Sequence, residues 1–303
     1  MAHLGTIGTA TLSTTSSSIT ITLSAGAPVG STVLLGIAWD AAAGGVPTIA
    51  SVTDSRGNSW STTPDMSVAA GTTVAVGGLR ARVTTALLTG DTITVTISGA
   101  ARGRWAAQAD AHSEVNTTPL DKTASNAPGS SASLSTGVTA ATTQANELVV
   151  AVFAFGSGRT VTVPSGWAAG PKVETTAGSG DRALLVAHRY VSATGTQEGT
   201  LGLSSASTYA AAVATYKYTP SGPPAVRISQ VSFEVPNPSD APLVRISQVA
   251  FEVPAATVGA VRIAQVSLEV PAAPGQRPPT GIKVLSDGVL QEAGLSVATQ
   301  GEV

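Results

Sequence analysis

The sequence predicts an all-β protein made of tandem β-sandwich modules, of jelly-roll or immunoglobulin-like type, followed by a C-terminal region of β-strand repeats. Two observations carry this prediction. Short segments in which apolar residues alternate with Thr recur through residues 1–220, and one phrase rich in β-branched residues recurs three times near the C-terminus. Only 11% of the residues are charged, against about 25% in typical soluble proteins. Ser and Thr hydroxyls and exposed backbone must therefore solvate much of the surface.

Five segments show the strand pattern most clearly, 18–23, 33–39, 92–97, 148–153 and 183–191. Period-2 alternation and β-branched runs between Gly, Pro, Ser and Asp are typical of sandwich strands. The alanine-rich segment Arg104–His112 admits a helix, because alanine favours helices. Alanine is abundant along the whole chain, however, so we expect a strand there.

Four pairs of segments repeat in the same order, with an offset that drifts from 115 to 104 residues, which indicates an internal duplication. The pairs are Val33–Ile37 with Leu148–Val152, Arg56–Trp60 with Pro164–Trp167, Leu79–Val83 with Ala187–Val191, and Arg104–Ala109 with Thr208–Val213. We expect a first sandwich module over residues 1–116 and a second over 117–220, each of about 100 residues. The joint is placed in the Thr-, Pro-, Ser- and Gly-rich stretch Asn116–Ser133. One larger jelly roll, with strands exchanged between the halves, is also compatible.

Proline divides the rest of the chain. Residues 221–224 form a Pro/Gly linker, residues 225–271 hold the three repeats, and residues 272–303 begin with a second Pro-rich linker. We expect a hairpin in the last segment, because Ser286-Asp-Gly288 supplies the positive φ angles of a tight turn between two apolar pairs.

The repeated phrase begins at Val226, Val244 and Val261, so its copies start 18 and then 17 residues apart, and each ends in proline. If the phrase is a strand, its apolar side changes at Ser229-Gln230. That change requires a bulge or two different packing neighbours. A unit this small cannot bury its apolar side alone, so it must stack on its copies, on other chains, or on both.

The repeats are therefore the predicted assembly surface. Arg and Glu recur in every copy and can form ladders of opposite charge, which set register more than stability because exposed pairs contribute only about 0.2–1 kcal/mol. We expect a homo-oligomer, with a trimer favoured, while a three-stranded meander, a solenoid or a three-chain spiral is also compatible. The predicted assembly residues are Val226, Arg227, Ile228, Phe233, Glu234, Val244, Arg245, Ile246, Phe251, Glu252, Val261, Arg262, Ile263, Leu268 and Glu269.

The phrase Val-Arg-Ile-Ser-Gln-Val-x-Phe-Glu-Val, repeated after a Thr-, Gly- and Ala-rich sandwich region, resembles a phrase of structural proteins of tailed bacteriophages. The resemblance is to minor tail proteins of phages of high-GC actinobacteria in particular. The ending that starts at Gly281 is similar to short Lys-Val-x-x-x-Gly endings of the same proteins, and Val33–Trp39 with Ser51–Trp60 resembles tandem sandwich modules of phage and secreted bacterial proteins. The resemblance implies a virion structural protein and brings no catalytic motif.

The composition of the chain argues against several classes of binding partner. A net charge of −2 offers no basic field to nucleic acid and no polybasic patch to anionic lipid. The chain has no cysteine, which excludes disulfides and Cys-ligated metals. The longest apolar run, Leu148–Phe155, is far shorter than the ~20 residues of a membrane span, and no Sec-type signal is visible. We expect a protein made in a host cytoplasm and located in the virion, with other virion proteins as partners, no nucleic acid and no membrane insertion.

No sequence pattern predicts a catalytic residue, a cofactor or a metal. Three histidines occur, His3, His112 and His188, and none stands at metal-ligand spacing from a second ligand. Asp110, His112 and Glu114 alternate along one expected strand and so could form an acid/base or metal cluster. A solvated strand face is the favoured interpretation of that trio.

Two further groups have a candidate role. The loop Asp54–Asn58 offers oxygen ligands of the kind that calcium prefers, but a β-turn closed by Asp and Asn side chains is favoured. Trp39 and Trp105 are candidates for stacking on a host cell-surface glycan, although all four tryptophans are more simply interpreted as core anchors. Trp60 and Trp167 stand at matched positions of the two halves and are expected to anchor the cores.

Together these patterns predict a non-enzymatic virion structural protein of a tailed phage. The expected role is a minor tail or fibre component, with outward sandwich modules and a C-terminal repeat region that oligomerises or docks on the particle. A capsid-decorating or head-fibre protein of the same virion is the nearest alternative. A carbohydrate-binding sandwich protein or a polysaccharide-acting enzyme is an alternative of a different class, and the enzyme should show paired carboxylates near a Trp-lined groove, which the sequence does not.

Overall fold

The computed structural model describes residues 3–41, 45–175, 181–219, 282–286 and 289–293. Contacts divide the chain into two units, Met1–Ser221 and Gly222–Val303. The described residues form strands, turns and loops, which confirms the expected all-β class. Their antiparallel sheets are all open, since none closes on itself. No helix in this part of the chain has the length and hydropathy of a membrane span.

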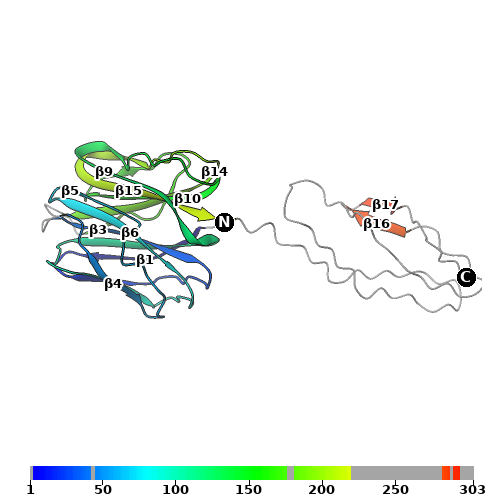
Figure 1. Ribbon diagram of the computed structural model, residues 1–303, viewed down its shortest axis with the longest axis horizontal. Helices are drawn as coiled ribbons and strands as arrows, with labels where there is room; N and C mark the ends of the chain where they lie inside the picture. The colour runs from blue at the N-terminus through cyan, green and yellow to red at the C-terminus, as the bar shows by residue number, and fades with distance from the viewer. Residues whose placement is uncertain (1–2, 42–44, 176–180, 220–281, 287–288, 294–303) are drawn as a thin grey trace, which may run out of the picture. The chain divides into compact units, whose positions relative to one another are not determined.

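Three sheets lie one on another in the first unit (Figure 1). The three-stranded sheet has the order β2 (Ser18–Thr22), β7 (Thr92–Ile97) and β4 (Ile49–Asp54). The five-stranded sheet in the middle has the order β1 (His3–Leu12), β8 (Trp105–His112), β3 (Thr32–Asp40), β6 (Val74–Arg82) and β5 (Met66–Ala70).

The third sheet has seven strands. Its main path has the order β11 (Val161–Thr162), β15 (Thr200–Tyr218), β10 (Asn146–Gly156), β14 (Arg182–Ser192) and β12 (Ala168–Ala169), while β9 (Val115–Ser135) pairs with β15 and β13 (Val173–Glu174) pairs with β14. Every strand of this sheet comes from residues 115–218, and every strand of the other two comes from residues 3–112. The two halves of the first unit therefore exchange no strand among the described residues.

The five segments with the clearest strand pattern are all strands, β2, β3, β7, β10 and β14. The alanine-rich segment is β8, so the expected strand is confirmed and the helix is wrong. Its alanines are buried on both faces: Ala107, Ala109 and Ala111 belong to the core on one side of the middle sheet, and Ala106 belongs to the core on the other side. Small side chains suit a strand that is covered on both faces by other sheets.

Successive side chains of each central strand point to opposite faces of its sheet, and the apolar side chains on these faces form three separate cores. On β3, Leu35 and Ile37 face the three-stranded sheet and belong to the first core, whereas Leu34 and Ala38 face the seven-stranded sheet and belong to the second. The third core lies on the far face of the seven-stranded sheet, around β10, β14 and β15. The continuous apolar runs in the sequence follow from this burial on both faces.

The stretch Asn116–Ser133, expected to join the two halves, is not an irregular linker but part of the 21-residue strand β9. Its composition lacks the usual strand signal because β9 is paired on one side only, with β15. Pro119 and Pro128 both fall where the register of that pair shifts. Proline is tolerated at such edges because the missing N–H has no partner strand to bond.

In the second unit, β16 (Ile282–Ser286) and β17 (Val289–Ala293) pair antiparallel, with Ser286 opposite Val289. This pairing is the one expected for the predicted hairpin, while Asp287 and Gly288 themselves lie outside the described residues. The repeats at residues 225–271, with all fifteen predicted assembly residues, lie outside the described residues, as does the linker at 221–224.

Candidate metal centre

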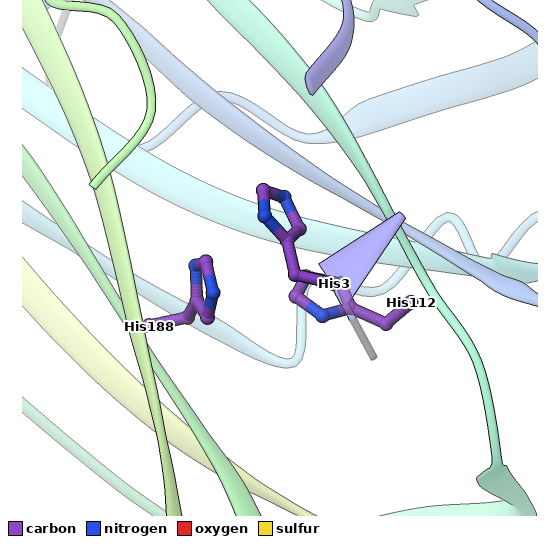
Figure 2. A group of neighbouring side chains, drawn as sticks. All are labelled: His3, His112 and His188. Carbon is purple, nitrogen blue, oxygen red and sulfur yellow. The ribbon is translucent and has the colours of Figure 1, made fainter. Parts of the chain in front are cut away.

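The three histidines of the chain lie next to one another where the five-stranded and seven-stranded sheets meet (Figure 2). His3 begins β1 and His112 ends β8, and the antiparallel pairing of these strands places the two residues directly opposite. His188 lies on β14 in the facing sheet. Three strands from two sheets thus supply one imidazole each.

Strand alternation directs these side chains into the same interface. On β8, Ala106 belongs to the core between the two sheets, and Asp110 and His112 follow on the same face. On β14, Val186 belongs to that core, and His188 follows two residues later. Each row of side chains is therefore apolar at one end and polar at the other, and the polar ends coincide.

The rings are within contact distance. The centroid of His3 lies 4.2 Å from that of His188 and 4.9 Å from that of His112, and the His112 and His188 centroids are 5.1 Å apart. One ring nitrogen of each residue can be chosen so that all three atoms lie within 4.8 Å of one another. The hydroxyl of Tyr190 lies 3.2 Å from Nδ1 of His112 and forms a hydrogen bond with it.

A buried carboxylate lies beside the cluster. Oδ1 of Asp110 is 3.7 Å from Nε2 of His3. Asp110 is held in place because Oδ1 accepts a hydrogen bond of 2.6 Å from the Thr6 hydroxyl and Oδ2 accepts one of 2.8 Å from the Gln108 amide. Nε2 of His3 is itself buried and has no hydrogen-bond partner.

Burial sets the charge state of two of the imidazoles. Desolvation first, and then the neighbouring His188 and His3, lower the pKa of His112 to about 3, while Asp110 partly opposes the shift. Desolvation followed by the proximity of His3 lowers the pKa of His188 to about 4. Both rings are therefore neutral at pH 7, which is the form in which imidazole ligates metals.

No family model, curated protein or solved structure matches the chain. The interpretation of the site therefore depends on its geometry and on the sequence pattern.

The sequence placed Asp110, His112 and Glu114 on one solvated face, and this is wrong. Asp110 and His112 are buried, because β8 is covered by the seven-stranded sheet. Glu114 follows the end of β8 with a positive φ of 61° and does not continue its alternation. Sequence spacing missed His3 and His188, because the three histidines come from different strands and short spacings report only residues on one element.

All four tryptophans contribute to the cores, which is the simpler of the two interpretations of the sequence. Trp39 and Trp105 are fully buried in the first core, 6.1 Å apart between ring centroids, so the predicted glycan contact is wrong for both. Nε1 of Trp105 donates a hydrogen bond to the Arg102 carbonyl inside the fold. Trp60 and Trp167 pack against the first and third cores, as expected for anchors.

The loop Asp54–Asn58 is a turn, as predicted. Oδ1 of Asp54 accepts a hydrogen bond of 2.8 Å from the backbone N–H of Arg56, and Gly57 has a φ of 74°. Oδ2 of Asp54 accepts a hydrogen bond of 2.7 Å from Nε1 of Trp60. Both carboxylate oxygens thus serve the turn and its packing.

Proposed function

We propose that the protein is a non-enzymatic structural component of a tailed-phage virion, a minor tail or fibre protein. The observation that carries this proposal is the threefold recurrence of one strand phrase within residues 225–271. Short repeats of this kind stack to form scaffolds and fibres, since one copy cannot bury its apolar side. The phrase also resembles that of minor tail proteins of actinobacterial phages, which favours a tail or fibre over an unrelated scaffold.

In this proposal the first unit is a pair of duplicated sandwich modules, residues 1–116 and 117–220, that present their loops outward. The shared strand order supports the duplication: β8-β3-β6-β5 in one sheet corresponds to β15-β10-β14-β12 in the other. Three of the four repeated sequence segments fall on corresponding strands, namely β3 with β10, β6 with β14, and β8 with β15. The absence of strand exchange between the described halves favours two modules over one fused jelly roll.

The partners in this proposal are other virion proteins and further copies of the same chain, with a trimer favoured. A capsid-decorating or head-fibre protein would assemble through stacked repeats in the same way, at another site on the particle. Glycan binding by the sandwiches has weaker support, because Trp39 and Trp105, its two aromatic candidates, are buried.

The experiment is a measurement of absolute mass by light scattering on the full chain and on two variants with equal added charge. In the first variant, Asp replaces the large apolar residue of each repeat, Phe233→Asp, Phe251→Asp and Leu268→Asp. In the matched control, Asp replaces the residue just before each of these, Ser232→Asp, Ala250→Asp and Ser267→Asp.

We expect the wild type and the control to be oligomers and the first variant to be a monomer of 29.9 kDa. An unpaired carboxylate in a stacked apolar face costs several kcal/mol, whereas one on the opposite face stays in water. A wild type that is monomeric at every concentration, or equal masses for the two variants, would contradict the proposal.

A further inference from the structure

The histidine cluster is a feature that assembly through the repeats does not require. The chain has three histidines, and all three meet at one point of the fold although they are far apart in the sequence. Burying polar rings costs free energy unless each ring nitrogen finds a partner. Among the described residues, Nε2 of His3 is a buried nitrogen without such a partner. A bound cation would satisfy it.

The donor set fits a metal ion of borderline softness. Imidazole nitrogens suit Zn²⁺, Co²⁺, Ni²⁺ and Cu²⁺, and three of them with one open position form a common zinc arrangement. A tetrahedral ion about 2.0–2.1 Å from each nitrogen holds the nitrogens about 3.3 Å apart. The nitrogens of His3, His112 and His188 already lie within 4.8 Å of one another, so closure by roughly 1.5 Å through side-chain torsions is enough.

The surroundings also fit a cation. The carboxylate of Asp110, fixed by Thr6 and Gln108, places a negative group next to His3. The Tyr190 hydroxyl occupies Nδ1 of His112, which leaves Nε2 of that ring for a ligand. Partners of this kind orient ligating histidines and are a regular part of metal sites.

We propose that His3, His112 and His188 bind one divalent transition-metal ion of the Zn²⁺ type, with Asp110 offsetting its charge. The proposed ligands come from β1 and β8 in one sheet and from β14 in the facing sheet. The ion therefore cross-links the two sheets through its coordination bonds. In a chain without cysteine, this is a cross-link between layers that disulfides cannot supply. The site is independent of the repeats and of their role in assembly.

The test uses the full chain without a polyhistidine tag, treated with a chelator and dialysed. ZnCl2 is titrated by calorimetry, CoCl2 is titrated by visible absorption, and CaCl2 serves as the control for a cation that prefers oxygen ligands. We expect one Zn²⁺ per chain, d–d bands of a four- or five-coordinate Co²⁺ site, and no Ca²⁺ binding. Zinc at 100 times its Kd should raise Tm by roughly 5–10 °C, because only the folded state holds the site.

Two ligand variants and one control locate the ion. His188→Ala removes the ligand of the seven-stranded sheet, and His3→Ala removes a partly exposed ligand at the start of β1, where folding should tolerate the change. Each should weaken Zn²⁺ binding more than about 100-fold, whereas Tyr190→Phe, which keeps all three ligands, should weaken it about tenfold or less. Circular dichroism and Tm of each metal-free variant report whether it folds.

Two results would overturn the proposal. One is a folded wild type that binds no Zn²⁺ with a Kd below about 10 µM. The other is a folded His3→Ala variant that keeps wild-type affinity and the wild-type Co²⁺ spectrum, which would place the ion elsewhere. The mass of the full chain is measured separately, so failure of the metal site leaves the test of assembly intact.

Discussion

The two cores on either side of the five-stranded sheet are built differently. The first core, against the three-stranded sheet, is centred on Trp39 and Trp105, both fully buried. The second core, against the seven-stranded sheet, is made of smaller aliphatic and alanine side chains with two buried tyrosines, Tyr216 and Tyr218. The second core also has polar contacts that cross from one sheet to the other. The first core holds one half of the unit together, while the second joins the halves in a defined arrangement.

The polar contacts across the second core are directional. Nη2 of Arg182 on β14 lies 3.6 Å from Oδ1 of Asp40 on β3. The hydroxyl of Tyr216 on β15 donates a hydrogen bond of 3.1 Å to Oδ2 of Asp65. Two flat apolar faces can dock in several registers, whereas buried polar groups are satisfied in only one. The histidine cluster lies at the same interface and adds a third such contact.

The largest effect is expected from the first core. Trp105→Ala should lower the free energy of unfolding by about 3–5 kcal/mol, because it leaves a large cavity between the three-stranded and five-stranded sheets. Urea unfolding monitored by circular dichroism measures the change, with exposed Val29→Ala as the control. A loss below about 1 kcal/mol would show that Trp105 is not central to this core.

A smaller loss of stability is expected when a methyl group is added at Gly36, where the two sheets of the second core lie close together. A Cβ added at Gly36 would lie 2.5 Å from Cγ2 of Val186 in the facing sheet. Gly36→Ala should therefore cost about 1–3 kcal/mol by overpacking. Gly195→Ala is the control, because a Cβ there meets nothing within 4 Å. Equal stabilities for the two variants would mean that the sheets pack less closely than described.

The polar contact between Tyr216 and Asp65 should contribute less. Tyr216→Phe removes one buried hydrogen bond and keeps the ring, so a loss of about 1 kcal/mol is expected. Asp65 retains its ion pair with Arg80, which limits the penalty. The measurement is the same urea unfolding, and a stability unchanged within about 0.3 kcal/mol would remove this contact from the account of docking.

The last prediction concerns Glu147, a buried carboxyl on β10, and tests how the stability of the seven-stranded sheet responds to pH. Burial first, and then the carboxylate of Asp121, raises the pKa of Glu147 from 4.5 to about 7, while Lys217 partly opposes the rise. The folded state then binds a proton more tightly than the unfolded state. Stability is therefore expected to fall as pH rises from about 4.5 to about 7 and to stay level above that.

Glu147→Gln should abolish this part of the pH dependence. Urea midpoints at pH 5 and pH 8 give the difference for the wild type and for the variant, and subtraction isolates Glu147 from other titrating groups. Identical pH differences in the two proteins would show that Glu147 titrates normally.

The strands were predictable where alternation or a continuous apolar run is present, as in β2 and β10. β9 was not, because an edge strand paired on one side tolerates polar residues, prolines and register shifts, and its sequence therefore looks like a linker. The burial of Trp39 and Trp105 was the simpler of two interpretations that the sequence allowed. Tryptophan serves cores and glycan platforms alike, and only the position of its strand between two sheets decides between them.

The candidate metal centre was predictable in part. The alternation of Asp110 with His112 on β8 indicated a possible metal cluster, although a solvated face was favoured, and no pattern indicated His3 or His188. Their meeting depends on how two sheets face each other and on the pairing of His3 with His112 across β1 and β8. Neither relation leaves a spacing motif in the sequence, so the cluster emerges only from the fold.

The measurement that tests the central claim most directly is the absolute mass, by light scattering, of the full chain and of a chain that ends at Thr219. The shorter chain keeps every described strand of the first unit and all described residues of its three cores. The account predicts about three times 29.9 kDa for the full chain and a monomer for the shorter one. Two monomers would contradict assembly through the repeats, and two oligomers would place the assembly surface in the first unit.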